Sequence, residues 1–448
     1  MAGEYDVVIV GGGIGGLSAA WMLRERRILV LEAGRRAGGR IYSESRGDYW
    51  LNFGAHLFGE ATSPVGRLVA ELGLDARPIP GDRMGLYFNG TLVTNRRPES
   101  LPLRLPLSLQ ARLSLVKMGL RLRAGVRRIM NAEKAGTDEA PAERRMKRLS
   151  FENQRTLDQY MGRLHPDAAL ILRTITERTG ASPEVMAAGY GLNSFTQVWS
   201  RHSLGRNLFG GSAGLPEAIA GKLGERIVLG ATVSSVKASA NEVEIRYRRD
   251  GEDHRAVARY AVVATEADVA RDIIEELPKG TADALNRIRY GPFLSAAVLT
   301  GEAGPMPWDH TYAIATPGLS FGVFFNQASS LRVGTRRPGG SLMLFTGALG
   351  AARLMSLSER GIERHFLADL GKLFPETRGI AREIRVQRWP KGAPYSFPGR
   401  AALQPALTSP LGRVYLAGDY LEFPSMEAAV RSGSEAAERI AEELRKNT

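Results

Sequence analysis

Asp6-Val-Val-Ile-Val10-Gly11-Gly-Gly13-Ile-Gly-Gly16 is the stretch that decides the fold of this 448-residue chain. Its apolar, β-branched residues 7–10 predict a short strand buried on both faces. The glycines then match the spacing G-x-G-x-x-G, and a segment of helical character follows. Between a strand and a helix, this pattern is typical of a dinucleotide-binding turn. Gly11 permits the tight turn, Gly13 lets the backbone approach a pyrophosphate, and Gly16 lets helix and strand pack closely.

A second predicted strand follows the turn and ends in an acid. Residues 28–31 are apolar, and Glu32 stands about 20 residues after the first glycine, as the fingerprint requires. A carboxylate here accepts hydrogen bonds from a ribose 2′-hydroxyl. The connection 24–27 is short and lacks a glycine, but it leaves Glu32 in place. The segment therefore predicts a bound dinucleotide.

The composition excludes several kinds of site. The chain has no cysteine, and hence no disulfide framework, zinc–cysteine module, thiol nucleophile or cysteinyl-linked cofactor. The spacing of the histidines predicts no metal site. Its 44% hydrophobic and 24% charged residues are typical of a globular protein. The net charge of +13 suits nucleic acid, an anionic membrane or an acidic small molecule.

We expect neither a secretory signal nor a membrane span. The first residues lead into the apolar strand without the basic and apolar regions of a signal peptide. The longest uncharged stretch, roughly residues 310–331, is broken by Pro317 and Gly318. A soluble, cytoplasmic protein is therefore the expectation.

The segment after the second strand distinguishes FAD from NAD. Residues 32–40, Glu-Ala-Gly-Arg-Arg-Ala-Gly-Gly-Arg, resemble the E-x(5)-G-G-R segment of the superfamily of flavin-containing amine oxidases, protoporphyrinogen oxidases and carotenoid desaturases. In that superfamily the Gly-Gly-Arg contacts the FAD pyrophosphate and approaches the flavin. Residues 51–56 resemble its D-x-G-G/A segment beside the flavin ring, with Asn52 in place of the commoner acid.

The resemblance continues along the chain. Residues 209–216 and 227–233 are similar to a segment whose last residue, here Val233, pairs its backbone with the adenine. Near the other end, residues 413–419 resemble a strand followed by an acid, Asp419, that binds the ribityl chain. A final helix from Met426 then directs its N-terminus at the flavin pyrimidine. The resemblance thus implies non-covalently bound FAD.

Two sets of site residues follow from the fingerprint and the resemblance. We expect His56 and Tyr395 to be catalytic, although His56 can equally be a structural histidine. The expected cofactor contacts are Gly11, Gly13, Ile14, Gly15, Gly16, Glu32, Ala33, Gly39, Arg40, Gly54, Ala55, His56, Val233, Ala264, Thr265, Trp389, Gly418, Asp419 and Met426.

The expected fold is α/β, with a discontinuous Rossmann-like FAD-binding domain and an inserted α+β substrate-binding domain. The cofactor segments fall in three separate pieces, 1–75, 206–285 and 386–448. The segments between them, 76–205 and 286–385, are assigned to the substrate domain.

Two absences distinguish the branches of the superfamily. Amine oxidases place a lysine near flavin N5, but the resemblance puts Ser295 or a neighbour at that position, and no lysine occurs between Lys279 and Lys372. Ser425 stands where one ring of the amine-sandwiching aromatic pair is expected. Residues 288–292 and 388–395 instead resemble protoporphyrinogen oxidase segments, which favours that branch.

The leading hypothesis is an FAD-dependent oxidase or dehydrogenase. It transfers a hydride to flavin N5 from a bulky, largely apolar substrate at a C–C or C–N bond, with O₂ as acceptor. Three alternatives stay open. They are an amine oxidase, in secondary metabolism for example, a non-redox isomerase or mutase that needs reduced flavin, and a membrane-peripheral protein that keeps FAD structurally.

Residues 101–131 contain seven cations and no acid. Leu109, Leu113, Val116, Leu120 and Val126 fall at helical spacing within them. This pattern is compatible with contact to an anionic bilayer, with a substrate-domain helix whose arginines extend to solvent, or with a cationic funnel for an acidic substrate. Residues 133–148 are expected to form an exposed loop that can serve as a lid. Nothing beyond charge indicates nucleic acid.

Overall fold

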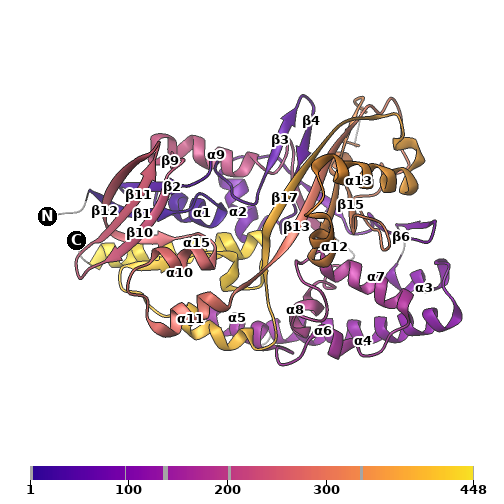
Figure 1. The fold of residues 1–448 in the computed structure, drawn as a ribbon, viewed down its shortest axis with the longest axis horizontal. Coiled ribbons are helices and arrows are strands. Elements are labelled where there is room, and N and C mark those ends of the chain that lie inside the picture. Colours follow the sequence, from indigo (N-terminus) through magenta and orange to yellow (C-terminus); the bar gives the residue numbers. More distant parts are fainter. Residues whose placement is uncertain (1–3, 96, 135–139, 200–202, 333–335, 447–448) are drawn as a thin grey trace.

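Two large β-sheets and a helical layer make up the protein. The computed structural model describes residues 4–95, 97–134, 140–199, 203–332 and 336–446. The sheets lie towards opposite ends of the molecule, and the long strands β13 (Arg289–Thr300) and β17 (Ala381–Tyr395) extend between them (Figure 1). The mixed α/β architecture is as predicted.

The first sheet contains the glycine-rich turn. Its strand order is β10-β11-β12-β1-β2-β9, and β18 pairs with β12. β1 is parallel to both β2 and β12, and its residues Val7, Val8 and Ile9 are completely buried, which explains the unbroken apolar run. The strands are β1 (Tyr5–Val10), β2 (Ile28–Glu32), β9 (Ile227–Leu229), β10 (Thr232–Ala238), β11 (Val243–Arg249), β12 (Glu252–Val263) and β18 (Val414–Leu416).

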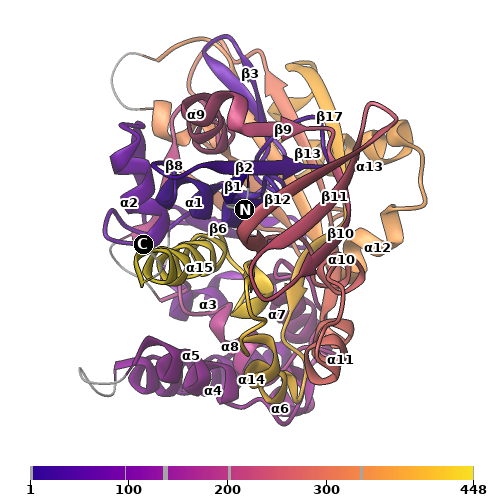
Figure 2. The same ribbon diagram turned by 90° about the vertical axis from the view of Figure 1, so that its left-hand side faces the viewer.

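Helices α1 (Ile14–Met22) and α15 (Met426–Lys446) share one apolar core with this sheet. Figure 2 shows α15 beside α1 below the strands. A Cβ atom on Gly433 of α15 would lie 2.0 Å from the carbonyl oxygen of Gly15 in α1, so only glycine allows this close approach. Further helices around this sheet are α2 (Pro64–Glu71), α9 (Gly214–Leu223), α10 (Ala267–Ile273), α11 (Lys279–Arg287) and α14 (Gln404–Leu407).

The second sheet has the order β17-β13-β16-β15-β14-β6-β7. Helices α12 (Ala348–Leu354) and α13 (Glu359–Leu373) contribute to its apolar core. Strand β17 crosses the predicted domain boundary at residue 385, and the domain division stays a prediction. The remaining strands of this sheet are β6 (Met84–Phe88), β7 (Thr91–Thr94), β14 (Ala313–Ala315), β15 (Val323–Asn326) and β16 (Gly340–Gly347). Two small sheets pair β3 (Ser43–Arg46) with β4 (Tyr49–Asn52) and β5 (Ala76–Pro80) with β8 (Ser203–Leu208).

The helical layer lies along the lower side of Figure 1 and corrects one prediction. Residues 133–148 were expected to form a loop, but their described part is the end of α4 and most of α5. Pro141 occupies the first turn of α5, where proline fits a helix, and Leu149 is buried, so the charged residues belong to an amphipathic helix. The layer comprises α3 (Leu101–Arg104), α4 (Leu109–Lys134), α5 (Pro141–Ser150), α6 (Leu157–Met161), α7 (Pro166–Glu177) and α8 (Ala188–Asn193).

Among the helices of the described residues, none combines the length and the apolar character needed to cross a bilayer.

Candidate active site

The glycine-rich turn has the geometry that its sequence predicts. Gly11 has a φ of +104°, and a Cβ atom there would lie 2.6 Å from the carbonyl oxygen of Ala264. A Cβ atom on Gly16 would lie 2.0 Å from the carbonyl oxygen of Gly11. A Cβ atom on Gly13 would instead meet no atom within 4 Å. The turn is therefore closed at Gly11 and Gly16 and open at Gly13, where the first N–H groups of α1 lack helical partners. This arrangement fits a pyrophosphate.

Glu32 is fixed by the turn beside it. Its Oε2 accepts a hydrogen bond from the N–H of Gly12 at 2.6 Å, and its Oε1 accepts one from Gly34 at 2.7 Å. Each carboxylate oxygen has a second lone pair, so the group can still accept ribose hydroxyls. The N–H of Ala231 donates to the Glu32 carbonyl at 2.8 Å, which brings the segment before Val233 next to Ala33. This backbone support for Glu32 was not predicted.

Arg40 and Asp419 form an ion pair that joins two distant segments. The guanidinium Nη2 lies 2.7 Å from Oδ1 of Asp419, and Nη1 donates to the carbonyl of Gly392 at 3.1 Å. Burial alone would lower the pKa of Arg40, but Asp419 raises it above its ordinary value, so the guanidinium stays charged. We expected both residues at the cofactor, and the structure adds that they bind one another.

Two other predicted cofactor segments, those of Gly39 and Ala264, lie against the turn. A Cβ atom on Gly39 would lie 3.3 Å from the Cα of Gly13, and the N–H of Ala55 donates to the Arg40 carbonyl at 3.0 Å. The N–H of Ala264 donates to the carbonyl of Val10 at 2.7 Å, and Thr265, two residues after the end of β12, lies near the same turn. The other predicted cofactor residues are located by the helix or strand to which they belong. Ile14, Gly15 and Gly16 begin α1, Gly54 follows β4, Val233 lies in β10, Gly418 follows β18, and Met426 begins α15.

Ser425 and Glu427 stabilise helix ends, which no motif of the sequence indicated. The Ser425 hydroxyl accepts a hydrogen bond from the N–H of Ala428 at 3.1 Å and so caps α15. The Glu427 carboxylate accepts hydrogen bonds from the N–H groups of Gly59 and Val65, at 2.8 and 3.0 Å. Val65 lies in the first turn of α2, so Glu427 ties the N-terminus of α15 to that of α2.

Ser295 and Trp389 hold the strand that leads to His56. Ser295 of β13 donates to the carbonyl of Phe53 at 2.7 Å, and the indole of Trp389 on β17 donates to the same oxygen at 3.0 Å. The Ser295 hydroxyl, which the resemblance predicts at or next to the position of the amine oxidase lysine, is thus engaged by the backbone. Asn52 donates to the Gly54 carbonyl at 3.1 Å. Three hydrogen bonds thus hold the backbone of residues 53 and 54 in place.

His56 is buried with one ring nitrogen unpartnered. Its Nδ1 lies 3.0 Å from the carbonyl of Gly54, which can only accept, so Nδ1 carries the proton. Nε2 then presents a bare lone pair, and it has no hydrogen-bond partner among the described residues. The rings of Phe325 and Tyr312 lie at 5.0 and 6.2 Å between centroids. Burial lowers the pKa of His56 to about 4, so the ring is neutral at pH 7.

The two predicted catalytic residues lie beside different apolar clusters. Tyr312 and Phe325, which contact His56, belong to a cluster that includes Ile79 and Leu204. Tyr395, at the end of β17, is half-buried against a cluster that contains Tyr190 and Phe423. The sequence carried no signal for Tyr312 or Phe325, because both lie more than 250 residues after His56 and belong to no motif.

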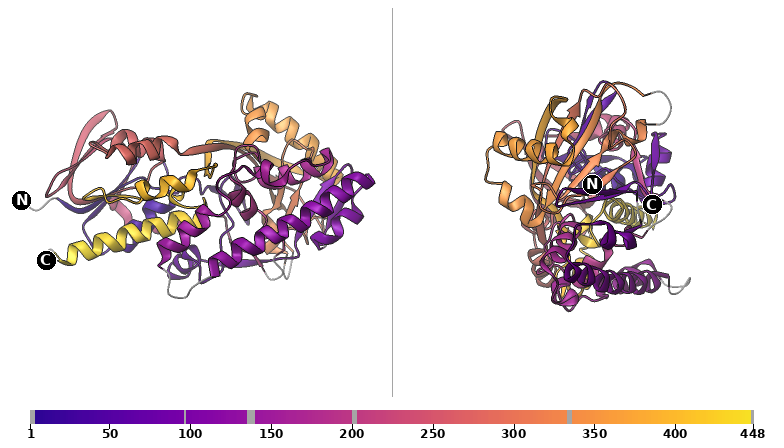
Figure 3. Two further views of the ribbon diagram at one scale, coloured as in Figure 1. Left: turned by 90° about the horizontal axis from the view of Figure 1, so that it is seen from below. Right: turned by 90° about the vertical axis from the view of Figure 1, so that its right-hand side faces the viewer.

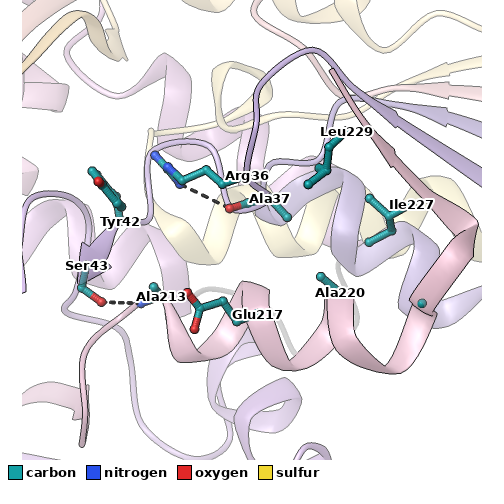
Figure 4. Close-up of a pocket in the computed structure, with 10 residues that line it drawn as sticks. Arg36, Ala37, Tyr42, Ser43, Ala213, Glu217, Ala220, Ile227 and Leu229 are labelled. Atoms are coloured by element: carbon teal, nitrogen blue, oxygen red, sulfur yellow. Dashed lines mark hydrogen bonds between the residues drawn. The ribbon is translucent and has the colours of Figure 1, made fainter. Parts of the chain in front are cut away.

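A cavity of about 310 Å³ lies beside the cofactor segments but contains none of the predicted contacts (Figure 4). The Arg36 guanidinium on its wall donates to the carbonyls of Gly39 and Ile41, at 2.7 and 3.0 Å, and so braces the loop before Arg40. The lining residues are Arg36, Ala37, Tyr42, Ser43, Ala213, Glu217, Ala220, Gly224, Ile227 and Leu229.

Comparison with protein families gives one match across nearly the whole chain. The family described as "Flavin containing amine oxidoreductase" matches residues 14–441. The chain belongs to this family. It is therefore an oxidoreductase, and the predicted cofactor, FAD, is supported. The resemblance to the amine oxidase superfamily is confirmed, whereas the preference for the protoporphyrinogen oxidase branch stays unconfirmed.

Two relatives are similar to this chain in sequence, and two solved structures are similar to it in fold. The L-amino-acid oxidase of Mus musculus is 26% identical over 97% of this chain and 70% of that protein. The flavin-containing amine oxidase A of Equus caballus is 40% identical, but the match spans 20% of this chain and 18% of that protein. The cyclohexylamine oxidase of Brevibacterium oxydans superimposes with a TM-score of 0.78 at 24% identity, over 98% of this chain and 99% of that one. A putrescine oxidase bound to putrescine gives 0.78 at 17% identity over the same shares, so both show the fold.

Proposed function

We propose that the protein is an FAD-dependent oxidase that removes two electrons from a bulky, largely apolar amine at its C–N bond, with O₂ as acceptor. The sequence left C–C and C–N bonds open. The relatives and fold neighbours are named as oxidases of amines and amino acids, and this favours the C–N bond.

His56 is the observation that carries the proposal. Its Nε2 offers a buried lone pair, and an amine N–H is the kind of donor that such an acceptor needs. The neighbouring rings of Tyr312 and Phe325 suit an apolar body. Nε2 could not donate a hydrogen bond to a substrate carboxylate, because the Gly54 carbonyl holds the ring proton on Nδ1. His56 therefore orients the amine nitrogen, and the aromatic rings exclude water.

The cofactor contacts predicted from the sequence complete the proposal. Gly13 and the N-terminus of α1 would hold the pyrophosphate, Glu32 the ribose, and the Arg40–Asp419 pair the chain between pyrophosphate and flavin. Bound FAD would supply the acceptor for the substrate hydride. The chain has no cysteine, so we propose that the attachment is non-covalent.

Anaerobic titration of the purified flavoprotein tests the substrate class. A cyclic aliphatic amine is expected to bleach the visible flavin band and to yield H₂O₂ when air is admitted. A matched ring compound without nitrogen is expected to leave the band unchanged. Bleaching by the nitrogen-free compound alone would contradict the C–N assignment. Turnover that begins only after dithionite reduction would instead support a mutase.

Two variants of one residue test the role of His56. H56F removes the acceptor and keeps an aromatic ring, so kcat/KM for the amine is expected to fall about tenfold or more, the loss of one buried hydrogen bond. H56Q carries an amide oxygen that can accept, and it is expected to restore most of that loss. Both variants should still bind FAD, because the glycine-rich turn, Glu32 and the Arg40–Asp419 pair are unchanged. H310Q, at an exposed histidine, is the control. Equal rates for H56F and the wild type would exclude the proposed role.

A further inference from the structure

Helix α4 carries two apolar stripes on opposite faces. The inner stripe includes Met118, Leu122, Val126 and Ile129, which are buried in the core of the helical layer. The outer stripe consists of Leu109, Leu113, Val116 and Leu120, which follow one another at spacings of four, three and four residues. These spacings place them on a single helix face. Most of the apolar positions that the sequence singled out therefore face away from the core.

The outer stripe is unusually exposed for aliphatic side chains. Leu109, Leu113 and Leu120 are 70%, 61% and 66% exposed, and Leu103 of the adjacent α3 is 71% exposed. Over the described residues, no other helix presents such a row of exposed large apolar side chains. A contiguous apolar surface of this kind indicates an interaction site.

Cations flank this stripe. Arg123 pairs with Glu99 at 3.1 Å and Arg128 with Glu152 at 3.3 Å, whereas Arg104, Lys117 and Arg127 have no carboxylate partner within the described part of the chain. The stretch 101–131 contains no acid of its own. The face formed by the outer stripe and these cations, which we call the α4 face, is therefore both apolar and positively charged.

We propose that the α4 face binds the surface of a bilayer that contains anionic lipids. Aliphatic side chains that enter the interface between cations near the headgroups are the pattern of an interfacial helix. A second copy of this chain would bring two rows of cations together, and their repulsion opposes self-association. Figure 3 shows α4 on the outside of the molecule when it is viewed from below, and its outer stripe is exposed.

The α4 face lies close to the apolar cluster against which Tyr395 packs. The inner stripe of α4 belongs to this cluster. Docking would therefore bring the bilayer to within about one helix diameter, roughly 10 Å, of that cluster. An apolar substrate dissolved in the membrane would then be close to the oxidase. The docking itself does not depend on the proposed function.

Flotation with lipid vesicles tests the proposal on the full-length protein. The wild type is expected to float with vesicles of phosphatidylcholine and phosphatidylglycerol but not with phosphatidylcholine alone, and salt is expected to release it. L113Q/L120Q and K117Q/R127Q should each lower the vesicle-bound fraction at limiting lipid about tenfold. The controls L349Q and K222Q/K279Q change exposed residues on other faces and should float like the wild type.

Three outcomes would overturn the proposal. They are equal flotation with both vesicle types, unchanged flotation of L113Q/L120Q, and a concentration-dependent dimer in light scattering that L113Q/L120Q abolishes. The last would show that a second copy covers the α4 face. All the substituted side chains are exposed, so each variant should keep the thermal transition and visible flavin spectrum of the wild type.

Discussion

The glycine-rich turn and the surroundings of His56 are built on opposite physical principles. In the turn, Gly11 and Gly16 bring backbone close to backbone, Gly13 leaves an open space, and the charged groups of Glu32 and Arg40 are engaged by partners. Around His56, aromatic and aliphatic side chains surround one neutral ring whose Nε2 is unpartnered. The first region is suited to a constant, charged ligand. The second can change its apolar walls without disturbing the first, so cofactor retention and substrate choice should be separable by mutation.

The largest expected effect is at the turn. Gly16→Val would place a Cβ atom 2.0 Å from the Gly11 carbonyl oxygen, so the turn cannot close. We expect loss of the flavin spectrum and of a cooperative thermal transition. Gly13→Ala is the matched variant, because its Cβ atom meets no protein atom within 4 Å. It should keep the fold and weaken FAD binding. Unchanged FAD affinity in Gly13→Ala would mean that the open space does not hold the cofactor.

The region around His56 should respond to pH instead. Burial lowers the pKa of His56 from 6.5 to about 4, so between these values the unfolded chain binds a proton that the folded chain does not. The contribution of His56 to stability is complete above pH 6.5 and declines as the pH falls towards 4, by about 3 kcal/mol in total. Denaturant unfolding of the wild type and H56F across this range measures the difference. If the free energy of unfolding changed with pH in the same way for the wild type and H56F, His56 would not be buried as described.

A smaller effect is expected where the turn meets the last segment of the chain. Asp419→Asn leaves the half-buried Arg40 without its ion-pair partner, which should cost about 2 kcal/mol and weaken FAD retention. The double variant R40M/D419N removes both charges. It should be more stable than the sum of the two single losses predicts, as measured in a double-mutant cycle. Strict additivity would mean that the two side chains do not interact.

Local patterns were predictable from the sequence, and contacts between distant segments were not. The turn, its flanking strand and Glu32 lie within 27 consecutive residues, so spacing alone specified them. The partners of His56 and the Arg40–Asp419 pair join residues hundreds of positions apart, which no spacing encodes. On α4, periodicity identified an apolar stripe but not its orientation, because the helix has two such stripes. Charge density suggested a loop at 133–148, whereas an amphipathic helix carries the same charges on its exposed face.

The order of strands in the first sheet has a consequence for synthesis on the ribosome. β1 lies between β2 and β12, and β12 in turn pairs with β18, whose residues are 414–416. More than 240 residues are therefore translated between β1 and its second neighbour, β12. Non-local pairing of this kind slows folding and leaves an apolar edge uncovered in the meantime. The nascent chain, rather than the finished enzyme, is thus the form most in need of a chaperone.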